Sequence, residues 1–128
     1  MKKVNIIMHP LVQHKLTELR KKETPKNHFR QLLREISLLL AYEITHELST
    51  NEVCIETPLE KFKSLKLSGK KLALISILRA GNGLLDGVLD LIPSARVGFI
   101  GLYRDEKTLK PVSYYYKVPK NLNTRDVI

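Results

Sequence analysis

Apolar residues recur at steps of three and four in the first third of the chain, which is the spacing of an amphipathic helix. A short series after Pro10 predicts one helix, and a longer series after Pro25 predicts a second. Thr24 is the candidate N-cap of the second helix, with Pro25 at its first helical position. The apolar face of this longer helix consists of Phe29, Leu32, Leu33, Ile36, Leu39, Leu40 and Ile44.

The pattern then changes to the short runs that are typical of strands. Residues 53–57 alternate between apolar and polar and predict a strand, with residues 62–67 as its candidate partner. Cys54 lies in the first of these runs and is interpreted as a buried or half-buried thiol. Because it is the single cysteine, it can form neither an internal disulfide nor a cysteine-based metal site.

A strand, a loop, a helix and a second strand follow one another in the middle of the chain. Residues 71–78, KLALISIL, are apolar on both alternating faces, as in a central parallel strand that is covered on both sides. The spacing predicts a helix over residues 84–92 and a strand over residues 97–103. This order predicts a βαβ unit and hence an α/β fold with a parallel-sheet core.

The last part of the chain predicts an arm and the start of another strand. Residues 104–107 are a charged, turn-like cluster, and residues 112–118 alternate with tyrosines on both faces, which predicts a β-arm or hairpin. Val127 and Ile128 look like the beginning of a strand, so we expect the sequence to stop in the middle of an element.

Composition limits the classes of partner. The 128 residues are 43% hydrophobic, which suits one domain with a real core. The net charge of +9 favours anionic partners, but the basic residues are scattered without interleaved aromatic residues, which argues against nucleic acid. No window resembles a membrane span or a signal peptide, so no membrane partner and a cytoplasmic location are expected.

Two arginines stand where ligands bind in open α/β sheets. Arg79 and Arg104 each end a predicted parallel strand, and Arg79 is followed by the glycine loop AGNG. Two guanidinium groups at one edge suit a di-anion or pyrophosphate. The alternative is that each arginine is an ordinary surface residue, as a single arginine at a strand end most often is. Asp86 and Asp90 share a helix face and are assigned to solvent. The four histidines have no metal-ligand spacing.

Five segments in collinear order strongly resemble bacterial-type uracil phosphoribosyltransferases. They are HPLVQHKL (residues 9–16), FRQLLREISLLLAYE (29–43), ILRAG (77–81), DLIPSARVGFIGLYRDEKTLKPVSYYYK (90–117) and TRDVI (124–128). The resemblance implies a type I phosphoribosyltransferase fold with N-terminal helices and a β-arm. It also implies the reaction of uracil with 5-phospho-α-D-ribose 1-diphosphate (PRPP) to give UMP and pyrophosphate, a step of pyrimidine salvage.

The same resemblance assigns roles to particular residues. Arg79 and Arg104 match the family arginines that contact the diphosphate of PRPP, and Ala80 and Gly81 line the same loop. The arm of residues 112–118 resembles an arm that packs between subunits, so a homo-oligomer is expected. Mg²⁺ is expected to arrive with PRPP. No catalytic residue is identified in the chain itself.

The resemblance also implies what residues 1–128 do not include. In the family, the strand beginning at VI continues into an acidic, glycine-rich PRPP loop, and a later segment recognises uracil. We therefore expect a single, C-terminally truncated domain with negligible transferase activity alone. Two alternatives stay open: a non-catalytic remnant or assembly module from a disrupted gene, and a basic RNA-binding relative.

Overall fold

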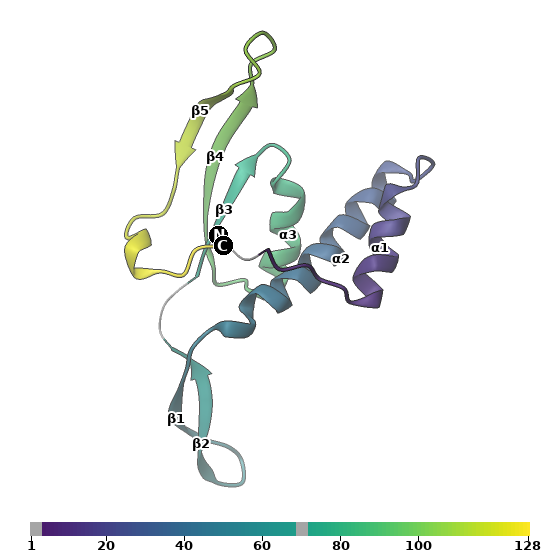
Figure 1. Cartoon of the computed structure of the whole chain (residues 1–128). Helices are drawn as coiled ribbons and strands as arrows, with labels where there is room; N and C mark the ends of the chain where they lie inside the picture. The colour runs from purple at the N-terminus through teal and green to yellow at the C-terminus, as the bar shows by residue number, and fades with distance from the viewer. Residues whose placement is uncertain (1–3, 69–71) are drawn as a thin grey trace.

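The computed structural model describes residues 4–68 and 72–128 and has the α/β organisation that the sequence predicts. Two N-terminal helices lead into a projecting hairpin, and a βαβ unit with an antiparallel arm follows (Figure 1). The described elements are α1 (Pro10–Arg20), α2 (Lys26–Ile44), a 3-10 turn (Thr45–Glu47), β1 (Thr50–Glu56), β2 (Lys61–Leu67), β3 (Ala73–Leu78), α3 (Asn82–Leu91), β4 (Arg96–Arg104), β5 (Pro111–Lys117) and a second 3-10 turn (Leu122–Thr124). No helix in this part of the chain is long and apolar enough to cross a membrane.

Both predicted N-terminal helices form, but the start of α2 differs from the prediction. The helix begins at Lys26, so Pro25 occupies the N-cap position, and the prediction of Thr24 as N-cap is wrong. The Thr24 hydroxyl instead donates to the carbonyl of Glu18 at 2.6 Å and closes the end of α1. An ion pair between Lys15 and Glu35, 2.6 Å apart, then joins the two helices.

The βαβ unit is confirmed, with β3 and β4 parallel and β4 and β5 antiparallel. Val127 forms an isolated parallel bridge with Ala73, so the chain end lies on the other side of β3 from β4. The expectation that β3 is covered along its whole length holds as far as Ser76 but not at the end of the strand. Ala73 is 0% exposed whereas Ile77 is 54% exposed. Lys71, which the prediction included in this strand, lies outside the described residues.

Helix α3 packs closely against α2. An added Cβ at Gly87 would overlap the Arg34 carbonyl oxygen and lie 2.6 Å from Cβ of Ser37. The Arg34 guanidinium donates two hydrogen bonds to the Asp90 carboxylate. Asp90 is exposed, as expected, but it is paired, because the packing of the two helices brings the Arg34 side chain to its position.

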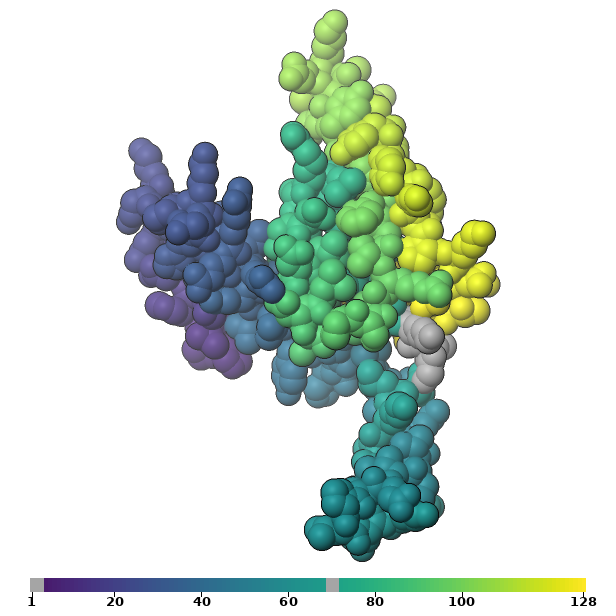
Figure 2. Space-filling view, turned by 180° about the vertical axis from the view of Figure 1, so that it is seen from behind, coloured from purple at the N-terminus to yellow at the C-terminus, as the bar shows by residue number. Residues whose placement is uncertain are grey.

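The hairpin of β1 and β2 projects away from the rest of the molecule (Figures 1 and 2). Its strands pair antiparallel from Thr50 with Leu67 to Glu56 with Lys61, which confirms the predicted pairing. Cys54 is exposed, so its interpretation as a buried or half-buried thiol is wrong. The reason is that most positions of both strands are exposed.

Candidate functional site

Arg79 and Arg104 lie at the same edge of the sheet. Leu78, the last residue of β3, pairs with Gly101 of the parallel strand β4, and Arg104 is the last residue of β4. Arg79 follows Leu78 in the turn after β3, so the two arginines lie at the carboxyl ends of neighbouring parallel strands. Both side chains are exposed, and neither forms an ion pair within the described ranges.

The loop after β3 folds tightly against the strand end. The Gly81 amide donates to the Ile77 carbonyl at 2.8 Å, and the peptide bond between Leu78 and Arg79 is cis. An added Cβ at Gly81 would lie 2.7 Å from the Ile77 oxygen and 2.9 Å from its nitrogen. Only glycine therefore fits at this position without a shift of the backbone.

The loop leaves two backbone donors unused beside Arg79. The amides from Gly81 to Leu85 donate within the loop and the first turn of α3, whereas those of Arg79 and Ala80 have no hydrogen-bond partner among the described residues. The start of α3 adds positive potential beside them. We call Arg79, Ala80, Gly81 and Arg104 the carboxyl-edge site, which can supply two guanidinium groups and two amides to an anion.

Asp105 organises the turn that follows Arg104. Its carboxylate accepts hydrogen bonds from the Thr108 amide at 2.7 Å, the Thr108 hydroxyl at 2.9 Å and the Lys107 amide at 3.1 Å. The Thr108 bonds are the main reason that the Asp105 pKa lies below its ordinary value. The sequence reasoning missed this role, although an aspartate that accepts from the backbone amide two residues on, as Asp105 does from Lys107, is a common turn residue.

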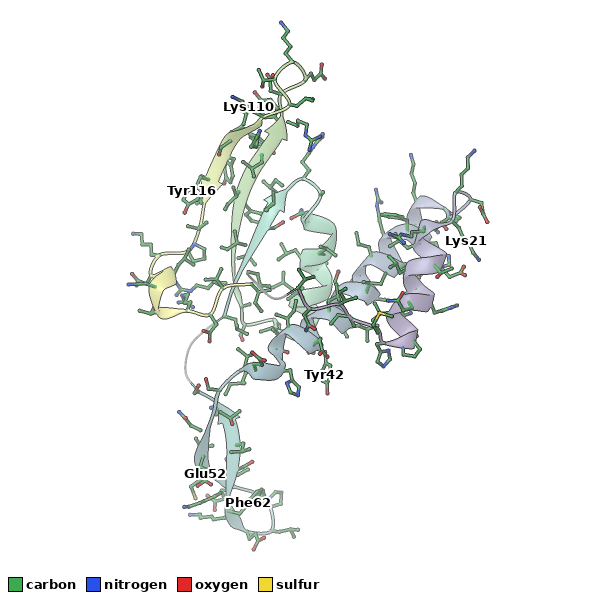
Figure 3. All side chains as sticks on the ribbon, viewed as in Figure 1. Lys21, Tyr42, Glu52, Phe62, Lys110 and Tyr116 are labelled. Atoms are coloured by element: carbon green, nitrogen blue, oxygen red, sulfur yellow. The ribbon has the colours of Figure 1, made fainter. Side chains whose placement is uncertain are left out.

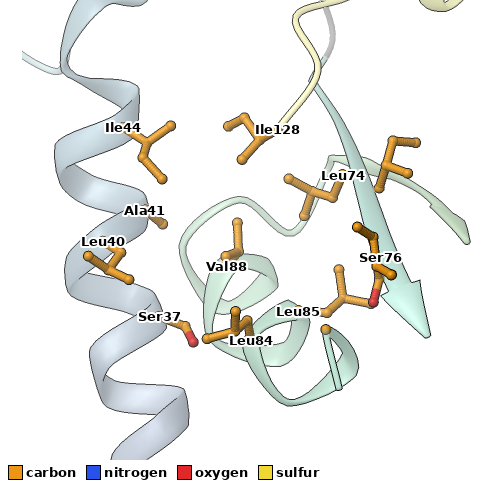
Figure 4. A pocket seen from close by; sticks show the side chains of 13 residues that line it. Ser37, Leu40, Ala41, Ile44, Leu74, Ser76, Leu84, Leu85, Val88 and Ile128 are labelled. Atoms are coloured by element: carbon orange, nitrogen blue, oxygen red, sulfur yellow. The ribbon is translucent and has the colours of Figure 1, made fainter. Parts of the chain in front are cut away.

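A pocket of about 310 Å³ opens between α2, α3 and β3. Its lining is mainly apolar, and Figure 4 shows Ile128 between α2 and β3 at one end of it. Ser76 also lines the pocket, and its hydroxyl is buried without a hydrogen-bond partner in the described structure. Sequence reasoning did not predict this pocket, since its only local signal is a serine within an apolar strand.

The residues of the structure offer no candidate metal centre. In the described ranges, no three His, Cys, Asp or Glu side chains are grouped so that they could hold a metal ion. Asp105 is the carboxylate next to Arg104 in the sequence, and its hydrogen bonds are used within its own turn. A resident metal site therefore does not fit the described side chains.

Comparison with known proteins gives one consistent result. The sequence model of the uracil phosphoribosyltransferase family matches residues 6–128. The chain is 64% identical over 125 residues to a uracil phosphoribosyltransferase of Paracoccus denitrificans, covering 98% of this chain and 59% of that protein. It is 56% identical over 128 residues to one from Acidovorax ebreus, covering 100% of this chain and 61% of that protein.

A solved structure has a similar fold. The AQ2163 protein from Aquifex aeolicus superposes with a TM-score of 0.84 at 31% identity, over 92% of this chain and 57% of that one. The chain therefore spans about three fifths of the length of the proteins it matches.

Proposed function

The chain belongs to the uracil phosphoribosyltransferase family, and we propose that its carboxyl-edge site binds the diphosphate of PRPP during the conversion of uracil and PRPP to UMP and pyrophosphate. The observation that carries this proposal is the register of β3 and β4, which brings Arg79 and Arg104 to one edge. Their guanidinium groups suit the paired phosphates of a diphosphate.

The site would act on the leaving group. In the proposed reaction, N1 of uracil forms a bond to C1 of the ribose and loses its proton, while the bond from C1 to the diphosphate oxygen breaks with its electron pair. Negative charge then develops on the departing pyrophosphate. Arg79, Arg104 and the amides of Arg79 and Ala80 would stabilise that charge from fixed positions.

Mg²⁺ has a place in this proposal only as an ion that accompanies PRPP. The described side chains do not group into a site for it, whereas Mg²⁺ commonly binds substrate phosphates with few protein ligands.

Binding of pyrophosphate and of PRPP to purified residues 1–128, measured by isothermal titration calorimetry, tests the proposal. Replacement of Arg79 or Arg104 by alanine should weaken binding by about 10-fold or more, since a hydrogen bond to a charged group contributes about 1.5–3 kcal/mol. Arg96→Ala is the matched control, because Arg96 is exposed at the opposite end of β4. Equal losses of affinity in all three variants would contradict the proposal, because they would show that the anion is attracted by the overall positive charge and not bound at this site.

The polypeptide of residues 1–128 is expected to have negligible transferase activity by itself. The carboxyl-edge site would contact only the leaving group. Stabilising a leaving group without positioning the attacking uracil accelerates the reaction very little. A radiolabelled uracil assay should detect no UMP above background. Formation of UMP at a rate typical of enzymes, about 1–1,000 s⁻¹, would contradict this expectation.

The exposed tyrosines of β5 favour association through the arm of residues 112–118. Tyr116 is 68% exposed on β5 and points away from β4 in Figure 3, whereas Tyr114 packs against Tyr103 with ring centroids 6.2 Å apart. Tyr116→Lys should shift a homo-oligomer towards monomer in sedimentation velocity. Lys110→Ala, at the exposed turn beside the arm, is the control.

A further inference from the structure

Ser76 of β3 is a buried serine whose hydroxyl is unpaired. The residue is 6% exposed, and its Oγ has no hydrogen-bond partner among residues 4–68 and 72–128. Ser37 of α2 is buried as well, at 1% exposed, but its hydroxyl donates to the Leu33 carbonyl at 2.6 Å. A buried hydroxyl without a partner costs free energy, because it gives up its bonds to water and gains none in return. The described conformation therefore leaves one hydrogen bond unmade at Ser76.

The Ser76 hydroxyl lies beside the loop of the carboxyl-edge site. Ser76 lines the pocket between α2, α3 and β3, so its side chain is on the face of β3 that α3 covers (Figure 4). Its Oγ is 3.0 Å from the position that an added Cβ at Gly81 would occupy. Since Gly81 has no side chain, nothing of that residue separates the hydroxyl from the loop backbone. A small movement of the loop can therefore bring one of its backbone groups to the hydroxyl.

The backbone of this loop is held firmly at Gly81 and weakly at the two residues before it. The Gly81 amide donates to the Ile77 carbonyl at 2.8 Å, whereas the bonds that the Arg79 and Ala80 carbonyls accept within the loop are 3.3 Å long. Ordinary N–H to O hydrogen bonds measure about 2.7–3.2 Å, so the two longer bonds are weak. The peptide group between Arg79 and Ala80 can therefore turn while Gly81 stays in place.

A turn of this peptide group would link a bound anion to Ser76. The N–H and the C=O of a trans peptide group point in nearly opposite directions. When the Ala80 amide turns outward to a diphosphate, the Arg79 carbonyl of the same peptide group turns inward, to the side on which Ser76 lies. A carbonyl oxygen has two lone pairs and a serine hydroxyl has one proton to donate. The Arg79 carbonyl is therefore a suitable acceptor for the unpaired hydroxyl.

We propose that Ser76 is a positioning residue of the carboxyl-edge site, and that its hydroxyl donates to the Arg79 carbonyl when the loop binds a diphosphate. The new bond holds the peptide group with the Ala80 amide directed at the anion. A hydrogen bond that forms only in the complex adds to affinity, because a ligand favours the conformation that it binds better. The inference rests on the proposed function, since it takes the diphosphate as the ligand of this site.

Ser76→Ala separates this role from a merely structural one, because the two roles change stability and binding differently. The substitution removes a hydroxyl that has no partner in the described conformation, so the melting temperature without pyrophosphate should be no lower than that of wild type. In isothermal titration calorimetry, the same variant should bind pyrophosphate about 5-fold more weakly, as the loss of one hydrogen bond requires. A lower melting temperature, or an unchanged affinity, would overturn the inference.

Two further serine variants are the matched controls. Ser76→Thr keeps the hydroxyl and can direct its methyl group into the pocket, so its affinity for pyrophosphate should stay within about 2-fold of wild type. Ser37→Ala removes a buried hydroxyl that is already paired with Leu33, so it should lower the melting temperature and leave the affinity unchanged. A loss of affinity in either control as large as that in Ser76→Ala would count against a role of the Ser76 hydroxyl.

Nuclear magnetic resonance of the Arg79 carbonyl carbon observes the bond itself. Saturating pyrophosphate should shift this resonance in wild type and shift it less in Ser76→Ala, because the variant has no hydroxyl to donate. Equal shifts in the two proteins would overturn the inference. Wild-type protein that does not bind pyrophosphate would overturn the proposed function and the inference with it, whereas binding that Ser76→Ala leaves unchanged would overturn the inference alone.

Discussion

Arg34 of α2 and Asp90 of α3 form a bidentate pair, with Nε to Oδ2 at 2.5 Å and the second guanidinium nitrogen to Oδ1 at 2.7 Å. The two residues are separated by 56 positions in the sequence. The pair therefore joins α3, the helix that follows the loop of Arg79, Ala80 and Gly81, to the N-terminal helix α2. Hydrogen bonding to Arg34 is the main cause of the lowered Asp90 pKa.

Asp90→Asn should lower the melting temperature at pH 7. Because folding depresses the Asp90 pKa, the carboxylate stabilises the fold above its unfolded pKa of about 3.9, and this contribution is lost as the pH falls through the folded value. The difference between wild type and variant in thermal circular dichroism should therefore shrink below about pH 3.9. Asp86→Asn, one turn earlier in α3, is the control, and an equal difference at both ends of the pH range would contradict the prediction.

Gly87→Ala should destabilise the packing of α2 on α3. The new methyl group would overlap the Arg34 carbonyl and approach Cβ of Ser37, which is 1% exposed. Overpacking of this kind costs about 1–3 kcal/mol of unfolding free energy, which urea denaturation can measure. Asp86→Ala tests the neighbouring exposed position, where little change is expected. A neutral effect of Gly87→Ala would show that the two helices can separate freely.

Gly81→Ala should impair pyrophosphate binding more than Gly83→Ala. At Gly81 the added methyl group would meet the backbone of Ile77, whereas at Gly83 it would meet the end of the flexible Leu33 side chain. The first substitution must move the loop that carries Arg79, and the second requires only a side-chain adjustment. Calorimetric titration of both variants should show a loss of about 10-fold or more for Gly81→Ala alone. Equal losses would mean that the loop position does not control binding.

Asp105→Ala should loosen the turn after Arg104. The substitution removes three hydrogen bonds from Lys107 and Thr108. Hydrogen exchange of the Thr108 amide should become several-fold faster, because that amide loses its acceptor. Glu106→Ala, in the same turn, should leave this exchange rate unchanged. If Thr108 keeps its protection in the Asp105 variant, another group must hold the turn.

Much of the fold was predictable from local pattern. The helix α2, the pairing of β1 with β2 and the order of the βαβ unit were all predicted and are confirmed. The predicted apolar face of α2 is buried only in its middle, because Phe29 and Ile44 at its ends are exposed. The family was also predicted from collinear segments, and the family match over residues 6–128 confirms it. These features depend on the periodicity of apolar residues and on the order of segments along the chain, both of which can be read from the sequence. The role of the carboxyl-edge site stays a prediction until binding is measured.

The two wrong predictions, for Thr24 and Cys54, have one cause in common. Thr24 was expected to cap α2, but its hydroxyl bonds to Glu18 at the end of the preceding helix. Cys54 was expected to be buried, but it lies in a hairpin with mostly exposed strands. In both cases the local pattern is compatible with two environments, and the neighbouring element decides between them.

The sequence by itself determined the elements, their order, the family and the positions of Arg79 and Arg104 at strand ends. Only the tertiary structure decided which of these features meet: the parallel register that brings the two arginines to one edge, the pairing of Arg34 with Asp90, and the pocket between α2, α3 and β3. The physical reason is that periodicity acts over one or two turns of chain, whereas these contacts depend on how whole elements pack together.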